Sequence, residues 1–385
     1  MSFSSFALHP DLLRAVDALG FTTPTAIQKT AIPPACAGHD VLACAMTGSG
    51  KTAAFLLPIL QSLLGASGGA CRALVLAPTR ELAAQIDEQR RALARFTRLG
   101  GAAVFGGVAL EPQVAAFRRG ADVLVATPGR LLDHLQRPHG RLDRVEILVL
   151  DEADRMLDMG FLPDIRRILA RLPGRRQTLL FSATLPAPIT ALARELLREP
   201  VTIDVERPSA SAVGVSHVAY PVAAEMKLPL LVELLRRPGV RNALVFTRTK
   251  HRANRVAEGL GRHGVRAERI HGNRSQAQRT RALSAFKAGT SRVLVATDIA
   301  ARGIDVTGLR HVVNFDVPPA AEDDIHRVGR TARAQAVGDA LTLVSPAEES
   351  DLRSIERAVG RRIERVRLPG FDYAARPARR VEYAG

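Results

Sequence analysis

Two short apolar sequences occur twice in this chain, each time 170 residues apart. Residues 73–76 read Ala-Leu-Val-Leu and return at 243–246 as Ala-Leu-Val-Phe, while the Val-Leu-Val-Ala-Thr at 123–127 returns unchanged at 293–297. One such echo is easily a coincidence, but two at the same offset indicate a duplicated unit. The 385 residues are also enough for two domains of ordinary size. The sequence therefore predicts a tandem of two related domains.

Both predicted domains belong to the α/β class. Short runs rich in aliphatic residues are bounded by turn signals and predict buried parallel strands at 73–77, 123–126, 147–150, 179–181, 243–246, 293–296 and 311–315. Helical patterns such as 81–96 and 252–263 lie between them, so strands alternate with helices. Pro, Ser and Ala collect without periodicity at 206–215, which predicts the joint. We expect a first domain at 1–207, a linker at 208–214, a second domain at 215–370 and a short basic tail at 371–385.

The charge of the chain favours a polyanionic partner. Lys and Arg outnumber Asp and Glu by 54 to 38, a net charge of +16. Nucleic acid is the simplest such partner, but a genome that favours Arg codons produces the same excess, so charge alone does not decide. Trp is absent and aromatic residues make up 4%, so we expect binding that tolerates many sequences and weakens with salt.

Cysteine usage and the amino terminus predict a cytoplasmic location. Cys36, Cys44 and Cys71 are an odd number without CxxC spacing, which argues against a disulfide framework and a zinc site and favours a reducing compartment. Residues 1–6 lack the pattern of a signal peptide, and no apolar run approaches the ~18 residues of a membrane span. We therefore expect no membrane association.

A glycine-rich loop predicts a phosphate site. An apolar strand at 41–43 precedes it, a helical pattern at 53–64 follows it, and the loop itself reads Ala45-Met46-Thr47-Gly48-Ser49-Gly50-Lys51-Thr52. Its glycines let backbone N–H groups turn toward a β-phosphate, Lys51 offers charge to the β and γ oxygens, and the Thr52 hydroxyl can bind Mg²⁺. Ala45 stands where the general pattern has Gly. Taken alone, the loop also fits an ordinary glycine-rich turn.

The strand at 147–150 supplies the second half of this site, because it runs directly into Asp151-Glu152-Ala153-Asp154. Asp151 is expected to hold Mg²⁺, usually through water, and Glu152 to polarise a water in line with the γ-phosphate. Acidic capping of the next helix is the plainer alternative. Acids matched to an upstream phosphate loop favour catalysis, with Lys51, Asp151 and Glu152 as catalytic residues.

A further motif carries a family resemblance. Phe3 lies seventeen positions before Gly20, the first residue of Gly20-Phe21-Thr22-Thr23-Pro24-Thr25-Ala26-Ile27-Gln28. With this motif, the phosphate loop and the acidic motif, residues 1–370 resemble a DEAD-box RNA helicase, most similar to the bacterial RhlE type. The resemblance implies two RecA-like domains, each a mostly parallel sheet flanked by helices. It also implies that Gln28 reads the adenine edge, where a carboxamide offers a donor and an acceptor, and that Phe21 packs on the base.

The same resemblance implies an RNA path on the first domain. It is expected to run along Pro78-Thr79-Arg80, Gly106-Gly107 and Thr127-Pro128-Gly129-Arg130. Hydroxyls, backbone N–H groups and arginine forks suit phosphates and 2′-hydroxyls better than base edges. Asp154, Ser182, Thr184 and, in the second domain, His326 are expected to couple the two domains.

The second domain has no phosphate loop of its own, but it has an arginine-rich motif at 326–333. The resemblance implies that Arg330 and Arg333 reach the γ-phosphate as arginine fingers. It implies nucleotide contacts by Gly303 and Asp305, with Asp305 on the ribose, and RNA contacts by Gly272, Arg279, Thr297 and Asp298. Ala332 stands where the family most often has Gly, which we interpret as a tolerated variant. His134, His139 and His217 have no ligand-spaced partners and are expected to be ordinary surface or core residues.

These expectations describe an enzyme that hydrolyses ATP to ADP and phosphate with Mg²⁺. Hydrolysis would be coupled to RNA binding and to local, non-processive unwinding of short duplexes or remodelling of ribonucleoprotein. A monomer acting on single-stranded RNA or short duplexes is expected, with ribosomal or RNA-decay proteins as candidate partners. An ATP-gated RNA clamp or annealing scaffold is one alternative. A DNA translocase is another, against which the motif ending at Gln28 and Ser182-Ala183-Thr184 argue.

Overall fold

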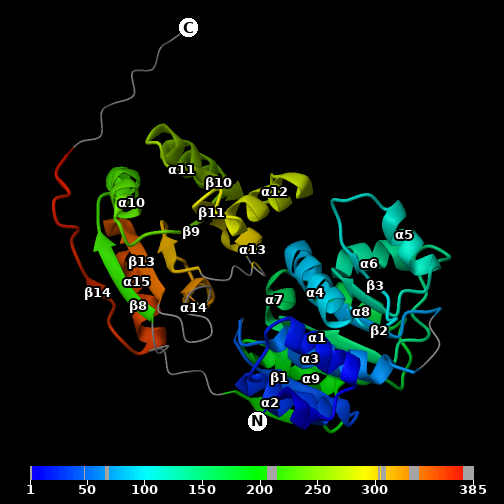
Figure 1. The fold of residues 1–385 in the computed structure, drawn as a ribbon. Coiled ribbons are helices and arrows are strands. Elements are labelled where there is room, and N and C mark those ends of the chain that lie inside the picture. The colour runs from blue at the N-terminus through cyan, green and yellow to red at the C-terminus, as the bar shows by residue number, and fades with distance from the viewer. Residues whose placement is uncertain are drawn as a thin grey trace. The chain divides into compact units, whose positions relative to one another are not determined.

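The computed structural model describes residues 2–46, 48–65, 69–205, 215–301, 304, 309–328 and 338–375. The chain divides into two compact units, Met1–Arg207 and Pro208–Gly385 (Figure 1). The predicted linker at 208–214 lies outside the described residues, so the limits of the linker stay a prediction. No helix in the described part of the chain is long and apolar enough to span a membrane.

The first unit is built on a parallel sheet of seven strands in the order β3-β4-β2-β5-β6-β1-β7. Its strands are β1 (Val41–Cys44), β2 (Ala73–Leu76), β3 (Gly101–Val104), β4 (Val123–Ala126), β5 (Ile147–Leu150), β6 (Gln177–Ser182) and β7 (Val201–Asp204). Its helices are η1 (Phe3–Phe6), α1 (Pro10–Ala18), α2 (Ala26–Cys36), α3 (Lys51–Leu63), α4 (Arg80–Leu93), α5 (Glu111–Arg118), α6 (Pro128–Leu135), α7 (Ala153–Asp158), α8 (Leu162–Leu169) and α9 (Ala187–Leu196).

The second unit holds another parallel sheet of seven strands, in the order β10-β11-β9-β12-β13-β8-β14. Its strands are β8 (Val215–Pro221), β9 (Ala243–Thr247), β10 (Ala267–Ile270), β11 (Val293–Thr297), β12 (His311–Asn314), β13 (Gly338–Val344) and β14 (Glu364–Arg365). Its described helices are η2 (Ala224–Met226), α10 (Lys227–Arg236), α11 (Lys250–Arg262), α12 (Gln276–Lys287), α13 (Asp298–Ala301), α14 (Ala321–Val328), η4 (Pro346–Glu348) and α15 (Glu349–Val359).

The two sheets confirm the duplication. Position by position along the two strand orders, β2 corresponds to β9 and β4 to β11, the same pairs that repeat in the sequence. The seven runs predicted as buried parallel strands and the strand predicted at 41–43 all exist, with ends within two residues of the prediction, and α-helices alternate with them. The α/β class and the tandem of related parallel sheets were therefore predicted correctly.

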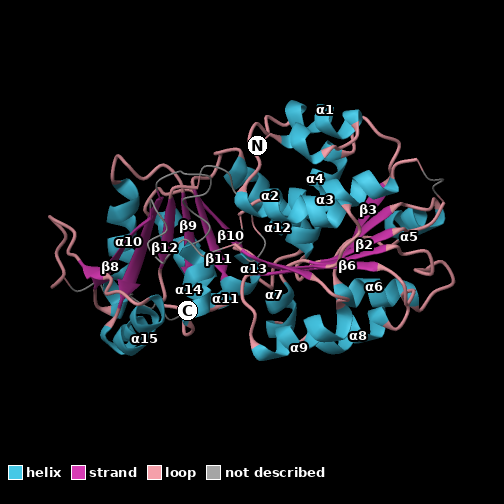
Figure 2. Ribbon diagram, turned by 90° about the horizontal axis from the view of Figure 1, so that it is seen from below, coloured by secondary structure: helices cyan, strands magenta, loops and turns pink. Residues whose placement is uncertain are grey.

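Helices cover both faces of the first sheet, and a separate apolar core lies on each face. One core joins alternate strand residues such as Val75 and Val149 to α1, α2, α3 and α4, and the other joins Leu74 and Leu148 to α6, α7, α8 and α9. Figure 2 shows α1 and α3 on one side of this sheet and α6, α8 and α9 on the other. Because strand residues point alternately to opposite faces, a sheet covered on both sides needs apolar residues throughout its central strands.

Candidate nucleotide and RNA site

The carboxyl ends of the first sheet's strands gather the predicted motifs at one edge. Since all the strands are parallel, the segments that follow β1, β2, β3, β4, β5 and β6 leave the sheet on the same side. These segments begin at Ala45, Ala77, Phe105, Thr127, Asp151 and Ala183. Ligands of open parallel sheets bind at this edge. The sheet thus brings the predicted phosphate, acidic and RNA motifs of the first domain together.

The loop after β1 has the form of a phosphate cradle. Gly48 and Gly50 adopt φ values of +84° and +96°, which favour glycine, and α3 begins directly afterwards at Lys51. The Lys51 ammonium is buried 4.0 Å from Asp151 Oδ1, and neither it nor the buried Ser49 hydroxyl has a hydrogen-bond partner among the described residues. Buried donors are costly without acceptors. They therefore fit a ligand rich in acceptor oxygens. Thr47 lies outside the described residues.

The acidic motif after β5 faces this loop. Burial raises the pKa of Asp151 to about 6, the Lys51 charge opposes that rise, and the Glu152 charge adds to it. The Glu152 N–H donates to Asp151 Oδ1 at 3.0 Å. Glu152 itself is buried and has a φ of +51°, a left-handed conformation that costs about 1–2 kcal/mol for a residue other than glycine. Such strain in a buried acid is a feature of functional sites.

The oxygen ligands at this position fit a magnesium ion. Asp151 supplies a carboxylate, and Thr52 lies in the first turn of α3. Among the described residues no group of three or more His, Cys, Asp or Glu side chains is placed to hold a metal. Mg²⁺ characteristically takes only one or two protein carboxylates and keeps several waters, so the residues present suit it better than Zn²⁺ or Ca²⁺.

Gln28 ties α2 to the phosphate loop, a contact that sequence reasoning missed. Its buried side chain accepts a hydrogen bond from the Thr25 N–H at 2.9 Å and donates one from Nε2 to the Gly50 carbonyl at 3.1 Å. A carboxamide has two donor hydrogens and two acceptor lone pairs, so each end keeps one position for a ligand. Phe21 is partly exposed and stacks on Phe3, with ring centroids 6.2 Å apart.

Asp154 is the acceptor at the centre of a buried cluster in the first unit. Its Oδ2 accepts hydrogen bonds from the Ala183 N–H at 3.2 Å and from the Thr184 N–H and hydroxyl, both at 2.9 Å. The Ser182 hydroxyl accepts from the Asp154 N–H at 3.2 Å and donates to the Thr184 carbonyl at 2.7 Å. The acidic motif and the segment after β6 are therefore joined within one unit. The side chain of His326 lies outside the described residues.

The predicted RNA motifs of the first unit contact one another. The Thr79 hydroxyl caps α4 by accepting from the Leu82 N–H at 3.2 Å. A Cβ atom added at Gly107 would overlap the guanidinium of Arg80, so this loop and the start of α4 are in close contact. Arg130, on α6, donates from Nη1 to the Val108 carbonyl at 3.3 Å. Pro78, Gly106, Thr127 and Pro128 lie in the same three segments.

In the second unit, the predicted residues follow the equivalent strands. Gly272 lies after β10, Thr297 ends β11, Asp298 begins α13, and Arg279 lies on α12. Both carboxylate oxygens of Asp298 bind the buried Arg327, at 2.5 Å from Nε and 2.7 Å from Nη2. Sequence reasoning missed this pairing, although Arg327 lies inside the arginine-rich motif. The remaining predicted nucleotide and catalytic residues, Gly303, Asp305, Arg330 and Arg333, lie outside the described residues.

His134, His139 and His217, which have no ligand-spaced partner in the sequence, form hydrogen bonds in the fold. His134 is buried as a core residue with Nδ1 3.0 Å from His139 Nε2, a contact that the sequence did not predict. Their separation of five residues on α6 and the following turn is not a ligand spacing, and the fold brings the rings together. His217 is buried with Nε2 2.9 Å from the Thr342 hydroxyl.

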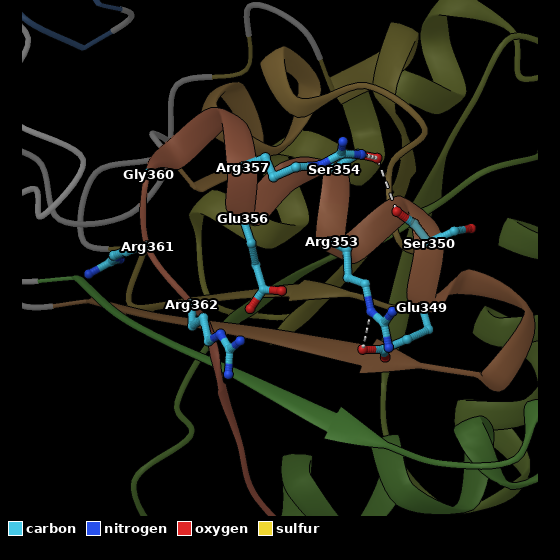
Figure 3. A pocket seen from close by; sticks show the side chains of 9 residues that line it. All are labelled: Glu349, Ser350, Arg353, Ser354, Glu356, Arg357, Gly360, Arg361 and Arg362. Carbon is cyan, nitrogen blue, oxygen red and sulfur yellow. Dashed lines mark hydrogen bonds and ion pairs between the residues drawn. The ribbon is translucent and has the colours of Figure 1, made fainter.

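A shallow pocket of about 770 Å³ lies against α15 in the second unit and contains none of the predicted site residues (Figure 3). Its lining is Glu349, Ser350, Arg353, Ser354, Glu356, Arg357, Gly360, Arg361 and Arg362. Arg365 binds both glutamates, and Arg353 lies 3.6 Å from Glu349. Both glutamates of the pocket are thus in ion pairs with arginines, as is common on a solvated surface.

Comparisons with known proteins agree with this geometry. The model of the DEAD/DEAH box helicases matches residues 25–192, and that of the helicase conserved C-terminal domain matches residues 226–335. The DEAD-box ATP-dependent RNA helicase CshA of Geobacillus kaustophilus is 41% identical over 380 residues, 99% of this chain and 81% of that protein. The CshA of Bacillus subtilis is 42% identical over 374 residues, 97% of this chain and 76% of that protein.

Solved structures give the same result. S. cerevisiae Dbp5 bound to RNA and ADP BeF3 has a TM-score of 0.85 and 31% identity, covering 95% of each chain. Mss116 bound to ssRNA and UDP-BeF has a TM-score of 0.87 and 28% identity, covering 96% of this chain and 80% of that chain. The curated relatives named above are CshA proteins, so the narrower resemblance to the RhlE type stays a prediction. The chain belongs to the DEAD-box family of ATP-dependent RNA helicases.

Proposed function

We propose that this protein binds ATP at the phosphate loop and couples its hydrolysis to RNA binding and to local unwinding of short RNA duplexes. The proposed nucleotide site rests on one observation: the buried donor groups of Lys51 and Ser49 have no hydrogen-bond partner among the described residues. The Lys51 ammonium lies 4.0 Å from Asp151 Oδ1, and the strained Glu152 is the next residue along the chain from Asp151. A triphosphate supplies the acceptors that these donors lack.

Each residue of the first unit has a proposed role in this chemistry. Lys51 binds the β and γ oxygens, and the N–H groups of the loop from Ala45 to Gly50 enclose the phosphates. Thr52 and Asp151 hold Mg²⁺, which when bound neutralises charge on the phosphates. Glu152 orients and deprotonates the attacking water. Gln28 binds the adenine edge with the donor and acceptor positions that remain on its carboxamide, and Phe21 packs its ring on the base.

RNA is proposed to lie along the segments after β2, β3 and β4, with Thr79, Arg80, Gly107, Thr127 and Arg130 on its backbone. The structure of Dbp5 bound to RNA and ADP BeF3, 31% identical, supports RNA as the polyanion. In the second domain, Gly272, Arg279, Thr297 and Asp298 are proposed RNA contacts. Arg330 and Arg333 are proposed to reach the γ-phosphate, and Gly303 and Asp305 are proposed to bind the nucleotide. The proposed coupling residues, which communicate between the domains whether ATP is bound, are Asp154, Ser182, Thr184 and His326.

Location and assembly remain predictions from the sequence. None of Cys36, Cys44 and Cys71 forms a disulfide in the described part of the chain, and a reducing compartment agrees with the proposed cytoplasmic location. A monomeric state and partners among ribosomal or RNA-decay proteins are likewise proposed.

Strand displacement tests the proposed function. A short RNA duplex with a single-stranded overhang should separate in ATP, and a DNA duplex of the same sequence should not. The Lys51→Ala variant should leave the RNA duplex intact, because it loses the charge that binds the phosphates. Equal separation of DNA and RNA would favour the DNA translocase. Strong ATP-dependent RNA retention without strand separation would favour the clamp.

A further inference from the structure

The loop between β3 and α5, residues 105–109, is held in a single arrangement by side chains that point at its carbonyl groups. Gln113 Nε2 donates to the carbonyls of Phe105 at 3.1 Å and Ala109 at 3.2 Å, one at each end of the loop. Arg130 donates to the Val108 carbonyl between them. No hydrogen bond within the described part of the chain is donated by the N–H groups of residues 106–108. The loop therefore offers its N–H groups to a ligand, as a phosphate-binding loop does.

Gln113 is itself held by a histidine relay. Gln113 Oε1 lies 3.2 Å from His134 Nε2, and His134 Nδ1 lies 3.0 Å from His139 Nε2. The carbonyls of the loop can only accept, so the amide end that faces them must be the NH₂ group. Oε1 then faces His134, whose Nε2 must carry the hydrogen. His134 Nδ1 is left as an acceptor, so His139 Nε2 donates to it.

The relay needs a neutral His134. Its ring is buried and stacks on Phe117 with centroids 4.9 Å apart. Burial first, and then the nearby charges of His139 and Arg130, lower the pKa of His134 to about 4. The neutral form therefore dominates at physiological pH, and each of these hydrogen bonds keeps its direction.

The relay also joins two of the proposed RNA segments. His134 and Arg130 lie one turn apart on α6, the helix that begins at Pro128 directly after Thr127. Through His134 and Gln113, this helix holds both ends of the loop, and through Arg130 it holds the middle. The spacing between the Gly106-Gly107 backbone and the start of α6 thus depends on buried side chains that lie outside the motifs.

We propose that Gln113 and His134 are positioning residues for RNA binding, which set the distance between the Gly106-Gly107 loop and the start of α6 so that both bind successive parts of one RNA backbone. This inference rests on the proposed RNA contacts of those two segments. Neither residue needs to touch RNA. Their effect passes through the carbonyl groups of the loop.

Steady-state ATP hydrolysis at increasing concentrations of single-stranded RNA tests this proposal. The variants are His134→Leu, which removes the donor to Gln113, and Gln113→Met, which keeps the volume and removes both donors to the loop. Each should raise the KM for RNA by about tenfold, as expected for the loss of about one hydrogen bond, with kcat at saturating RNA near the wild-type value. The double variant should resemble the single ones, because both break the same chain. Should His134→Leu fail to fold, Gln113→Met alone decides.

Two controls separate positioning from general damage. His217→Leu removes a buried, hydrogen-bonded histidine of the second unit and should lower the melting temperature without changing the KM for RNA. His134→Gln restores a donor toward Gln113 and should recover most of the RNA affinity. An unchanged KM in both His134→Leu and Gln113→Met, or fully additive effects, would overturn the proposal. A wild-type protein that RNA does not stimulate would refute the proposed function itself, and this inference with it.

Discussion

Replacing Gly50 by alanine should disturb the contact between Gln28 and the phosphate loop. Gly50 has a φ of +96°, and an added Cβ would lie 2.7 Å from Gln28 Nε2 and 2.9 Å from Thr25 Oγ1. A residue other than glycine in a left-handed conformation costs about 1–2 kcal/mol. Displacing Gln28 also breaks its bonds to the Gly50 carbonyl and the Thr25 N–H, at about 1 kcal/mol each. We therefore expect Gly50→Ala to lose about 3–4 kcal/mol of unfolding free energy.

Gly38 provides the matched control for this substitution. Its φ is +85°, and an added Cβ would meet nothing within 4 Å. Gly38→Ala should therefore lose only the backbone part, about 1–2 kcal/mol. Since the chain has no tryptophan, urea unfolding is best followed by circular dichroism, with ATP affinity measured on the same samples. ATP affinity should fall only in Gly50→Ala, because Gln28 and the loop both belong to the proposed nucleotide site.

A third variant isolates the Gln28 contact. In a Gln28→Ala background the atom nearest to the new Cβ is gone, so Gly50→Ala should lose less free energy than it does in the wild type. Equal losses for Gly50→Ala and Gly38→Ala in the wild-type background would refute the reasoning, because the contact with Gln28 would then contribute nothing.

Three further substitutions test other parts of the site. Asp154→Ala should destabilise the first unit by about 2–4 kcal/mol, because three donors, one buried and two partly buried, lose their acceptor. Thr184→Val removes one of these donors and should lose about 1 kcal/mol, so equal losses for the two variants in thermal unfolding would contradict the cluster. The pKa of Asp151 is raised to about 6, so lowering the pH below that value protonates the carboxylate and should weaken MgATP binding about tenfold per pH unit. In a fluorescent-nucleotide titration, Asp151→Asn should abolish this pH dependence. Arg327→Lys cannot form the paired bonds to Asp298 and should destabilise the second unit by about 2–3 kcal/mol in urea unfolding, whereas an unchanged midpoint would show that the pair contributes little.

The strands that were predicted from the sequence are buried on both faces, although β13, buried at six of its seven residues, was missed. β2, β4 and β5 are continuous aliphatic runs because helices cover each side of them. β3 was missed because Gly-Ala-Ala-Val carries little apolar bulk, and β8 because His217 and Ser216 interrupt its apolar pattern. β14 has only two residues, both exposed, so its sequence carries no strand signal.

The candidate site was predictable where one segment carries its own chemistry. The phosphate loop and the acidic motif each combine a strand end with the residues proposed to bind a phosphate or a metal, so their local sequence is sufficient to predict them. The bonds of Gln28 to Gly50, Asp298 to Arg327 and His134 to Gln113 join residues 22, 29 and 21 positions apart. Those contacts depend on how helices pack at the edge of each sheet, and no local pattern encodes that packing.

Phosphate release from ATP, measured with and without single-stranded RNA for the wild type and Glu152→Gln in parallel, tests the central claim most directly. Glu152→Gln keeps the shape of the side chain and removes the base proposed to activate water. We expect RNA to raise the wild-type rate severalfold, and the variant to hydrolyse almost no ATP while still binding RNA in the presence of ATP. A wild-type rate that RNA does not change, or a variant that hydrolyses ATP as fast as the wild type, would contradict the account.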